Sequence, residues 1–206
     1  MTEFKQNIDL RKIHFTSDTH FCHNNIIEFC NRPFKDVNHM NESIINNWNK
    51  VVAIDDEIYM LGDVCLCNED KKVTEILNRL NGKIYLIKGN HEKSVLNKQY
   101  NRDRFEWIKD YYEMTIADPE AYGGRQSIVL CHYGFRVWNK SHHGSYHLYG
   151  HSHDTMEREI WGRSMDVGID SANRILGEYR PFNYIEIRAI LSKRSNNPVD
   201  HHIGTR

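Results

Sequence analysis

The chain has 206 residues, 39% of them hydrophobic and 27% charged, a size and composition that favour one compact domain over two. Its 27 Lys and Arg residues balance 28 Asp and Glu residues, so the net charge of −1 gives no global reason to expect a nucleic-acid partner or an anionic membrane. No apolar run is long enough to cross a bilayer, and residues 1–15 lack the layout of a secretory signal. We therefore expect a cytoplasmic protein without a membrane partner, and the oligomeric state stays open.

Short apolar runs alternate with amphipathic stretches in the first half of the chain. Apolar residues at helical spacing predict one helix over residues 40–51 and a second over 73–80, which ends at Asn81-Gly82. Strand, helix and strand in that order predict parallel pairing in an α/β fold. The predicted strands along the whole chain are Lys12–Thr16, Glu57–Leu61, Lys83–Lys88, Ser127–Cys131, Ser145–Tyr149 and Asn183–Ile187.

The second half shows less helical periodicity. Two strands flank a turn at Gly123-Gly124, and further strands follow closely, so we expect more antiparallel pairing there. No internal repeat or flexible linker interrupts the chain. We predict a single domain over residues 1–190 and a polar, loose C-terminal tail over 191–206.

Potential metal ligands follow five of the predicted strands. Turn chemistry does not explain this pattern, and in open α/β sheets ligands bind outside the carboxyl ends of the strands, so these side chains are expected to converge on one crevice. In chain order they are Asp18, His20, Asp63, Asn90, His91, His132, His151 and His153.

The spacing and the residue types indicate the chemistry of this crevice. Asp18 and His20 are two residues apart, as are His151 and His153, and residues two apart in an extended chain point to the same side. Carboxylates, imidazoles and one amide suit Mn²⁺, Fe²⁺, Co²⁺, Ni²⁺ or Zn²⁺. Without His91 the set provides seven ligands, too many for one ion, and they fit two ions that share a carboxylate.

At this point the chain resembles a known family, the calcineurin-like metallophosphoesterases. The resemblance implies an α/β fold in which a two-sheet β-sandwich is flanked by helices, with a dinuclear metal centre at its edge. It covers residues 18–153 in the family's order. The motifs that carry it are Asp18-x-His20, Gly62-Asp63, Gly89-Asn90-His91-Glu92, His132 and Gly150-His151-Ser152-His153.

The resemblance also implies a role for each motif residue. Asp63 would bridge two divalent transition-metal ions, with Mn favoured and Fe, Zn, Ni or Co as alternatives. Asp18, His20 and His153 would complete the first metal site. Asn90, His132 and His151 would complete the second.

The implied reaction is phosphoester hydrolysis. Two cations about 3.5–4 Å apart can share a hydroxide that attacks phosphorus in line, while they neutralise charge on the attacking and leaving oxygens. His91 is the candidate general acid, because an imidazole exchanges a proton near neutral pH, and Glu92 is expected to orient its neighbours.

The substrate is less well defined by the sequence. We expect a small, nucleotide-like phosphodiester or phosphomonoester. A nuclease acting on DNA or RNA ends and a non-catalytic scaffold of the same fold are the alternatives. The chain lacks the Asp-Arg-Gly that follows Gly-Asp in Ser/Thr protein phosphatases, which disfavours that branch, and Gly134 stands where relatives of this size often have Pro.

Substrate contacts are predicted at His23, Arg136 and Arg174, and Arg32 is a further possible phosphate clamp. Each has a plain structural alternative. His23 could instead cap a helix that starts near Asn24, and the arginines could be ordinary surface residues.

Overall fold

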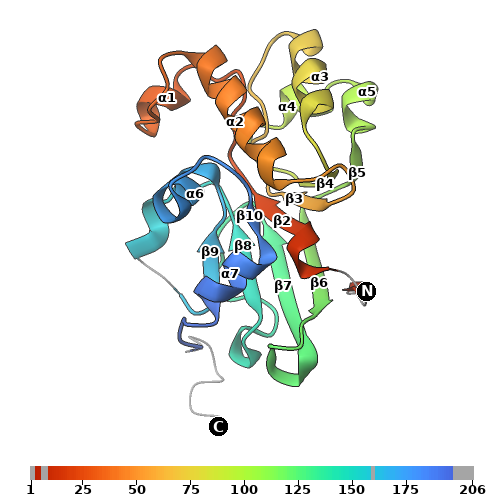
Figure 1. The fold of residues 1–206 in the computed structure, drawn as a ribbon, viewed down its shortest axis with the longest axis vertical. Coiled ribbons are helices and arrows are strands. Elements are labelled where there is room, and N and C mark those ends of the chain that lie inside the picture. Colours follow the sequence, from red (N-terminus) through yellow and green to blue (C-terminus); the bar gives the residue numbers. More distant parts are fainter. Residues whose placement is uncertain (1–2, 6–8, 159–160, 197–206) are drawn as a thin grey trace.

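Two five-stranded sheets form the centre of the computed structural model, which describes residues 3–5, 9–158 and 161–196 (Figure 1). Sheet 1 has the strand order β10-β2-β3-β4-β5, and sheet 2 has the order β1-β6-β7-β8-β9. The strands are β1 (Glu3–Lys5), β2 (Ile13–Thr16), β3 (Glu57–Met60), β4 (Lys83–Ile87), β5 (Phe105–Lys109), β6 (Tyr111–Ala117), β7 (Arg125–Cys131), β8 (Tyr146–Tyr149), β9 (Ser164–Asp166) and β10 (Phe182–Asn183).

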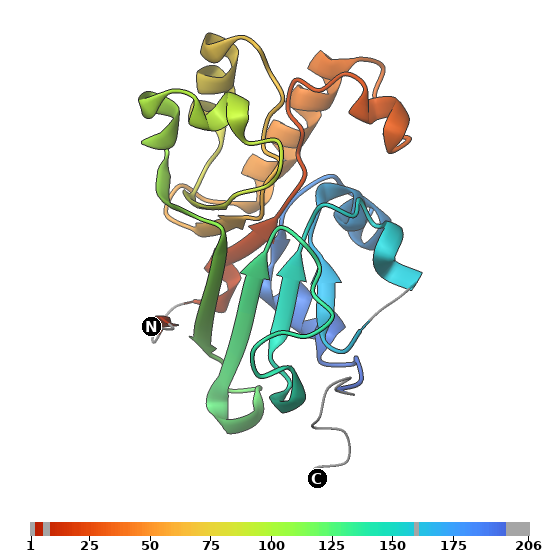
Figure 2. The same ribbon diagram turned by 180° about the vertical axis from the view of Figure 1, so that it is seen from behind.

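Sheet 1 is parallel apart from β10, and helices cover its outer face. Helix α2 (Val37–Val51) begins at Asp36, whose carboxylate accepts a hydrogen bond from the His39 backbone N–H at 2.8 Å, and α3 (Asp70–Arg79) follows β3. Both helices lie on the same side of sheet 1, away from sheet 2 (Figures 1 and 2). The other α-helices are α1 (Ile26–Phe29), α4 (Lys93–Leu96), α5 (Gln99–Arg102), α6 (Ile169–Leu176) and α7 (Tyr184–Leu191).

The alternation of side chains along the strands builds two hydrophobic cores. Ile58 and Met60 of β3 pack with the buried faces of α2 and α3, whereas Tyr59 and its neighbour Leu61 belong to the core between the two sheets. This arrangement confirms the predicted two-sheet sandwich flanked by helices. It also confirms the two predicted helices and the predicted strands that became β2, β3, β4, β7 and β8.

The predicted strand Asn183–Ile187 is wrong. Strand β10 ends at Asn183, and α7 begins at the next residue. The Asn183 side chain accepts a hydrogen bond from the Glu186 backbone N–H at 3.0 Å, and Glu186 accepts one from the Asn183 N–H at 2.9 Å. This capping box starts a helix at Tyr-Ile-Glu-Ile, a sequence rich in the aromatic and β-branched residues that are common in strands.

The expected antiparallel second half is also largely wrong. Strands β6 and β7 do form an antiparallel hairpin around the Gly123-Gly124 turn, but β8 pairs parallel with both β7 and β9. The connections 132–145 and 150–163 are long enough for the crossovers that parallel strands need, although neither contains an α-helix among its described residues.

The predicted tail begins at the last residue of α7. Residues 197–206 of it lie outside the described residues. Asn196 donates a hydrogen bond to the His142 carbonyl at 3.0 Å, and Arg194 donates one to the Ser164 carbonyl, so residues 192–196 remain in contact with the domain. Among the helices of the described ranges, we find none with the length and hydropathy of a membrane span.

Candidate metal centre

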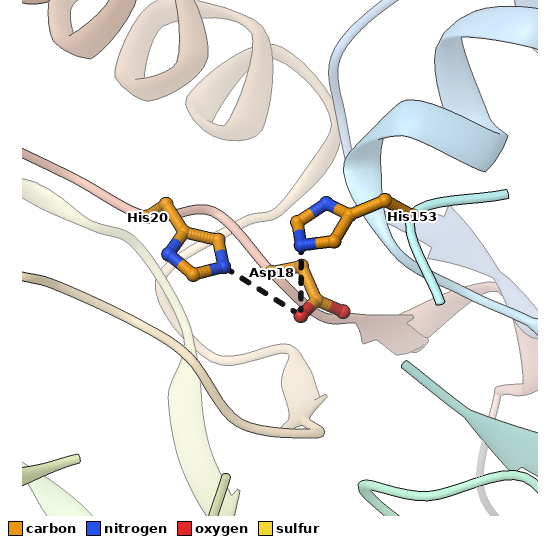
Figure 3. Close-up of side chains that lie close together, drawn as sticks. All are labelled: Asp18, His20 and His153. Carbon is orange, nitrogen blue, oxygen red and sulfur yellow. Dashed lines mark ion pairs between the residues drawn. The ribbon is translucent and has the colours of Figure 1, made fainter. Parts of the chain in front are cut away.

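The loops that follow β2, β3, β7 and β8 bring six of the predicted ligands into two clusters. Asp18, His20 and His153 form one, and Figure 3 shows both imidazoles beside the Asp18 carboxylate. The second contains Asp63, His132 and His151. Within each cluster the candidate ligand atoms all lie within 4.8 Å of one another, which is close enough to surround one ion.

The Asp63 carboxylate lies between the two clusters. Its Oδ1 accepts a hydrogen bond from the His91 backbone N–H at 2.8 Å. Its Oδ2 lies 3.5 Å from His20 Nε2 and 3.7 Å from His132 Nε2, one imidazole from each cluster. The geometry is that of a carboxylate able to contact two cations.

Asp18 is held in the same way. Its Oδ2 accepts a hydrogen bond from the His151 backbone N–H at 2.8 Å. Its Oδ1 lies 3.8 Å from His20 Nε2 and 3.9 Å from His153 Nε2. In both aspartates a backbone N–H therefore fixes one oxygen and leaves the other directed at imidazole nitrogens.

Hydrogen bonds on the far side of two rings orient the histidines. His132 Nδ1 lies 2.7 Å from the Leu61 carbonyl oxygen, and His153 Nδ1 lies 2.8 Å from the Asp170 carboxylate. An Nδ1–H that donates to such an acceptor leaves Nε2 as the lone-pair atom that binds a metal. Both Nε2 atoms face the carboxylates.

The first cluster contains buried polar atoms that a cation would satisfy. Asp18 Oδ1 and His20 Nε2 are buried and have no hydrogen-bond partner within the described part of the chain, a costly state for polar atoms. Burial and the neighbouring Asp166 carboxylate raise the pKa of Asp18, and burial lowers the pKa of His20. A divalent cation would favour the ionised carboxylate and the neutral imidazole, so this donor set fits a metal ion.

Asn90 adjoins the second cluster. Its Oδ1 lies 3.1 Å from His132 Nε2, and both Asn90 and His151 are exposed to solvent, whereas His132 is fully buried. Six of the seven predicted ligands thus lie in the two clusters, and the seventh, Asn90, lies beside the second.

The backbone of the ligands differs from the extended geometry expected from the sequence. Five of the seven have positive φ: Asp18, His20, Asp63, His151 and His153. The rule for extended chains therefore does not apply here: Asp18 and His20 lie in the same cluster, as expected, but His151 and His153 join different clusters. A left-handed conformation costs about 1–3 kcal/mol for a residue other than Gly and concentrates at functional sites.

Glycines allow the loops to approach the carboxylates. A Cβ on Gly89 would lie 2.7 Å from the Asp63 backbone nitrogen, and one on Gly150 would lie 2.6 Å from the Ser17 Cβ. Real Cβ atoms do not come this close, so the glycines of the Gly-Asn-His-Glu and Gly-His-Ser-His motifs are needed for packing.

Arg32 is not a phosphate clamp. It is 3% exposed, and its guanidinium forms two hydrogen bonds of 2.8 Å with the Asp170 carboxylate and one of 2.8 Å with the Asp18 carbonyl. Cys30, His153 and Asp170 form a third group of possible ligands. Because Asp170 already pairs with Arg32, we interpret it as the residue that orients His153.

Sequence reasoning missed Asp166 and Asp170. Asp166 is the last residue of β9, fully buried, and accepts hydrogen bonds from the backbone N–H groups of Asp154 and Gly168 at 3.0 and 2.7 Å. The ligands were identified because they stand at the carboxyl ends of predicted strands, which we call the strand-end rule. This rule would also have identified Asp166 if the three-residue strand β9 had been predicted. Asp170 lies in the first turn of α6, which was also not predicted.

The three predicted substrate contacts, His23, Arg174 and Arg136, have different surroundings. The Nδ1 atom of His23 lies 3.4 Å from His20 Nδ1, beside the first cluster, and α1 begins at Ile26 without a side-chain cap. The Arg174 guanidinium pairs with Asp154, with one hydrogen bond of 2.8 Å. The Arg136 guanidinium stacks 4.8 Å from the centre of the Trp161 ring.

His91 is exposed, and its ring centre lies 5.8 Å from that of His20. Glu92 is 4% exposed, and burial together with the Asp63 charge raises its pKa to about 7. Its Oε1 lies 3.4 Å from the Gly89 backbone nitrogen, within the loop that carries Asn90 and His91.

The fold and the centre define an α/β protein whose two mixed sheets present a cluster of carboxylates and imidazoles suited to divalent metal ions. The chain belongs to the calcineurin-like phosphoesterase family, whose model matches residues 11–185. Members of this family are metal-dependent phosphoester hydrolases, which is the class of enzyme that the sequence resemblance implied.

Relatives extend the similarity over most of the chain. An uncharacterized protein of Methanocaldococcus jannaschii, MJ1445, is 53% identical over 189 residues, which cover 90% of this chain and 94% of the relative. The Gene 66 protein of Mycobacterium phage L5 is 25% identical over 79% of this chain and 88% of its own length. The crystal structure of AQ665 from Aquifex aeolicus, a protein of unknown function, has a TM-score of 0.64 and 24% identity, over 86% of this chain and 98% of that one, and it supports the fold alone.

Proposed function

We propose that the protein hydrolyses a phosphodiester or phosphomonoester bond of a small, nucleotide-like substrate at a dinuclear centre. The position of Asp63 Oδ2, 3.5 and 3.7 Å from imidazole nitrogens of the two clusters, carries the proposal. Two divalent cations at this place would supply a hydroxide nucleophile near neutral pH and neutralise charge on the phosphate oxygens. Mn²⁺ is the first metal to test, and Fe²⁺, Zn²⁺, Ni²⁺ and Co²⁺ are the alternatives that this donor set also suits.

Residues of the chain provide the metal ligands and the proton donor. Asp18 and Asp63 bring negative charge to the metal sites, and Asn90 adds a neutral ligand, so the centre keeps a net positive charge toward a phosphate. His91 is held by its backbone N–H on Asp63 Oδ1 and exposes its imidazole to the solvent side of the centre. In the proposed reaction His91 donates a proton from there to the leaving oxygen.

The metal requirement is tested with chelator-treated protein and the variant Asp63→Asn. Wild-type protein is expected to bind two Mn²⁺ ions and to hydrolyse bis-p-nitrophenyl or p-nitrophenyl phosphate. Asp63→Asn is expected to lose both properties. Folded wild-type protein that binds two ions and hydrolyses neither ester with Mn²⁺, Ni²⁺, Co²⁺ or Zn²⁺ would contradict the proposal.

The proton-donor role of His91 is tested with leaving groups of different basicity. His91→Asn is expected to retain its metal ions and to lose about 10²–10⁴-fold in rate with an alkoxide leaving group, which needs the proton. The loss with nitrophenolate should be much smaller. His39→Asn, at an exposed histidine of α2, is the matched control. Equal losses for both leaving groups would exclude a general-acid role.

A further inference from the structure

A polar cavity lies at the end of the domain away from the metal centre. Its volume is about 410 Å³, and its lining includes Asp118, Arg125, Lys140, Tyr146, Arg163 and Arg188. Arg125 begins β7 and Cys131, next to His132, ends it. A rise of about 3.3 Å per residue therefore places roughly 20 Å of strand between the cavity and the metal centre. In Figure 1 this end carries the β6–β7 hairpin, opposite α2 and α3.

The charges around this cavity are predominantly positive. Arg125, Lys140, Arg163 and Arg188 contribute four cations, and the lining contains two carboxylates, Asp118 and Glu120. Both carboxylates are paired with Arg188, at 2.8 Å each. The cavity therefore has an excess of positive charge in a chain whose net charge is −1.

Two of the cations have no carboxylate partner among residues 3–5, 9–158 and 161–196. Lys140 is exposed and forms no ion pair there. Arg163 donates only a long hydrogen bond, 3.4 Å, from Nε to the Arg194 carbonyl oxygen. Guanidinium groups suit phosphate oxygens because their donors match them in pairs.

The Tyr146 hydroxyl adds a second, independent feature. Tyr146 is 2% exposed, lines the cavity and forms no hydrogen bond within the described ranges. A phenol hydroxyl can donate one hydrogen bond, so a ligand in the cavity that accepts one would give this donor a partner. Burial raises the pKa of Tyr146, which keeps the group a donor at neutral pH.

We infer that this cavity is a binding site for a small phosphorylated molecule, distinct from the metal centre. Lys140 and Arg163 contact the phosphate oxygens, and the Tyr146 hydroxyl donates a hydrogen bond to one of them. The volume is within the range of small-molecule sites. This inference does not depend on the proposed hydrolysis.

The test is calorimetric titration of the full-length, metal-free protein with inorganic pyrophosphate, after removal of the chelator. Without metal ions, the proposed catalytic centre lacks the divalent cations that would bind the probe there. One pyrophosphate is expected to bind per chain, and Lys140→Gln and Arg163→Gln are each expected to bind it about tenfold more weakly, since each removes a charge-assisted contact. Tyr146→Phe should weaken binding without changing the charge.

Two controls separate this site from other causes. Lys71→Gln removes the same charge at an exposed position of α3 outside the cavity and should bind as wild type does. Asp63→Asn should also leave pyrophosphate binding unchanged. Lys140 is exposed, so its substitution should not disturb folding. Absence of binding, or binding that responds to Asp63→Asn but not to Lys140→Gln and Arg163→Gln, would overturn the inference.

Discussion

The substitution Asp170→Asn tests whether Asp170 orients a metal ligand or only stabilises the fold. The side chain keeps its shape but loses its charge. His153 Nδ1 and Arg32 Nη2 both lie 2.8 Å from Asp170 Oδ2, and the Arg32 side chain is completely buried. Although burial opposes ionisation, His153 and Arg32 hold the pKa of Asp170 below its usual range, so the wild-type group is a carboxylate.

The substitution has two effects, one on the folding free energy and one on metal binding. The Arg32 guanidinium would remain buried without its anionic partner, a change that costs about 3–5 kcal/mol of folding free energy. The His153 ring would lose the acceptor that fixes its tautomer, and loss of such a partner weakens metal binding about 10–100-fold. Metal binding should weaken at the cluster of Asp18, His20 and His153, which contains this ring.

The assay combines denaturant unfolding with a metal competition against a chromophoric chelator. One of two Mn²⁺ ions is expected to bind 10–100-fold more weakly in Asp170→Asn, the range expected for loss of such a partner. The double variant Arg32→Met with Asp170→Asn removes the uncompensated charge, so it should regain part of the stability while metal binding stays weak. Recovery of metal affinity together with stability would show that Asp170 acts only on the fold.

A matched control is the neighbour of His153 in the chain, Asp154. Asp154 pairs with Arg174, but the two side chains are 18% and 48% exposed. Asp154→Asn should cost at most about 1 kcal/mol and leave the metal affinity unchanged. An Asp170→Asn protein that is folded and binds both ions as wild type does would refute the orienting role.

Three further predictions concern packing, capping and protonation. Gly150→Ala should destabilise the protein by about 1–3 kcal/mol and weaken metal binding, because its Cβ would overlap Ser17 beside the Asp18 loop, as a combined unfolding and metal titration would show. Asn183→Ala should cost about 1 kcal/mol in urea unfolding by removing the cap of α7; an unchanged midpoint would contradict the capping role. Burial lowers the pKa of His147 to about 4, below the value near 6.5 of an unfolded chain, so the unfolded state takes up the proton first and stability should fall by up to about 3 kcal/mol between pH 6.5 and 4. An imidazole signal of His147 that titrates near pH 6.5 in the folded protein would exclude this residue as the cause of the loss of stability.

The strand-end rule explains why the ligands could be predicted from the sequence. Strands β2, β3 and β4 are parallel, and β7 is parallel to β8, so the residues that follow them emerge at common edges whatever the loops between them do. Asp166 and Asp170 were not predicted, because β9 has three residues and α6 has eight, which is too few for a clear periodic pattern.

The start of α7 was mispredicted because two local patterns compete. Residues 184–187, Tyr-Ile-Glu-Ile, are rich in the aromatic and β-branched residues that suit a strand, while Asn183 and Glu186 satisfy the capping box. Tertiary packing favours the helix, because Tyr184, Ile187 and Leu191 lie on one helical face and all three are fully buried in the core between the sheets. A strand would have placed Tyr184 and Ile187 on opposite faces.

The left-handed backbone of the ligands links the metal centre to the stability of the whole domain. Five ligand residues with positive φ cost on the order of 5–15 kcal/mol together, with the aspartates at the lower end, and this is as large as the net stability of a typical domain. The hydrogen bonds from His91 and His151 to the two aspartates fix this geometry, but each contributes only about 1.5–3 kcal/mol. The buried cores on both faces of sheet 1 must offset the rest, and cations that bind only the folded chain would add to them. The sandwich therefore serves the centre directly, because it provides the free energy that keeps the ligands in a strained arrangement.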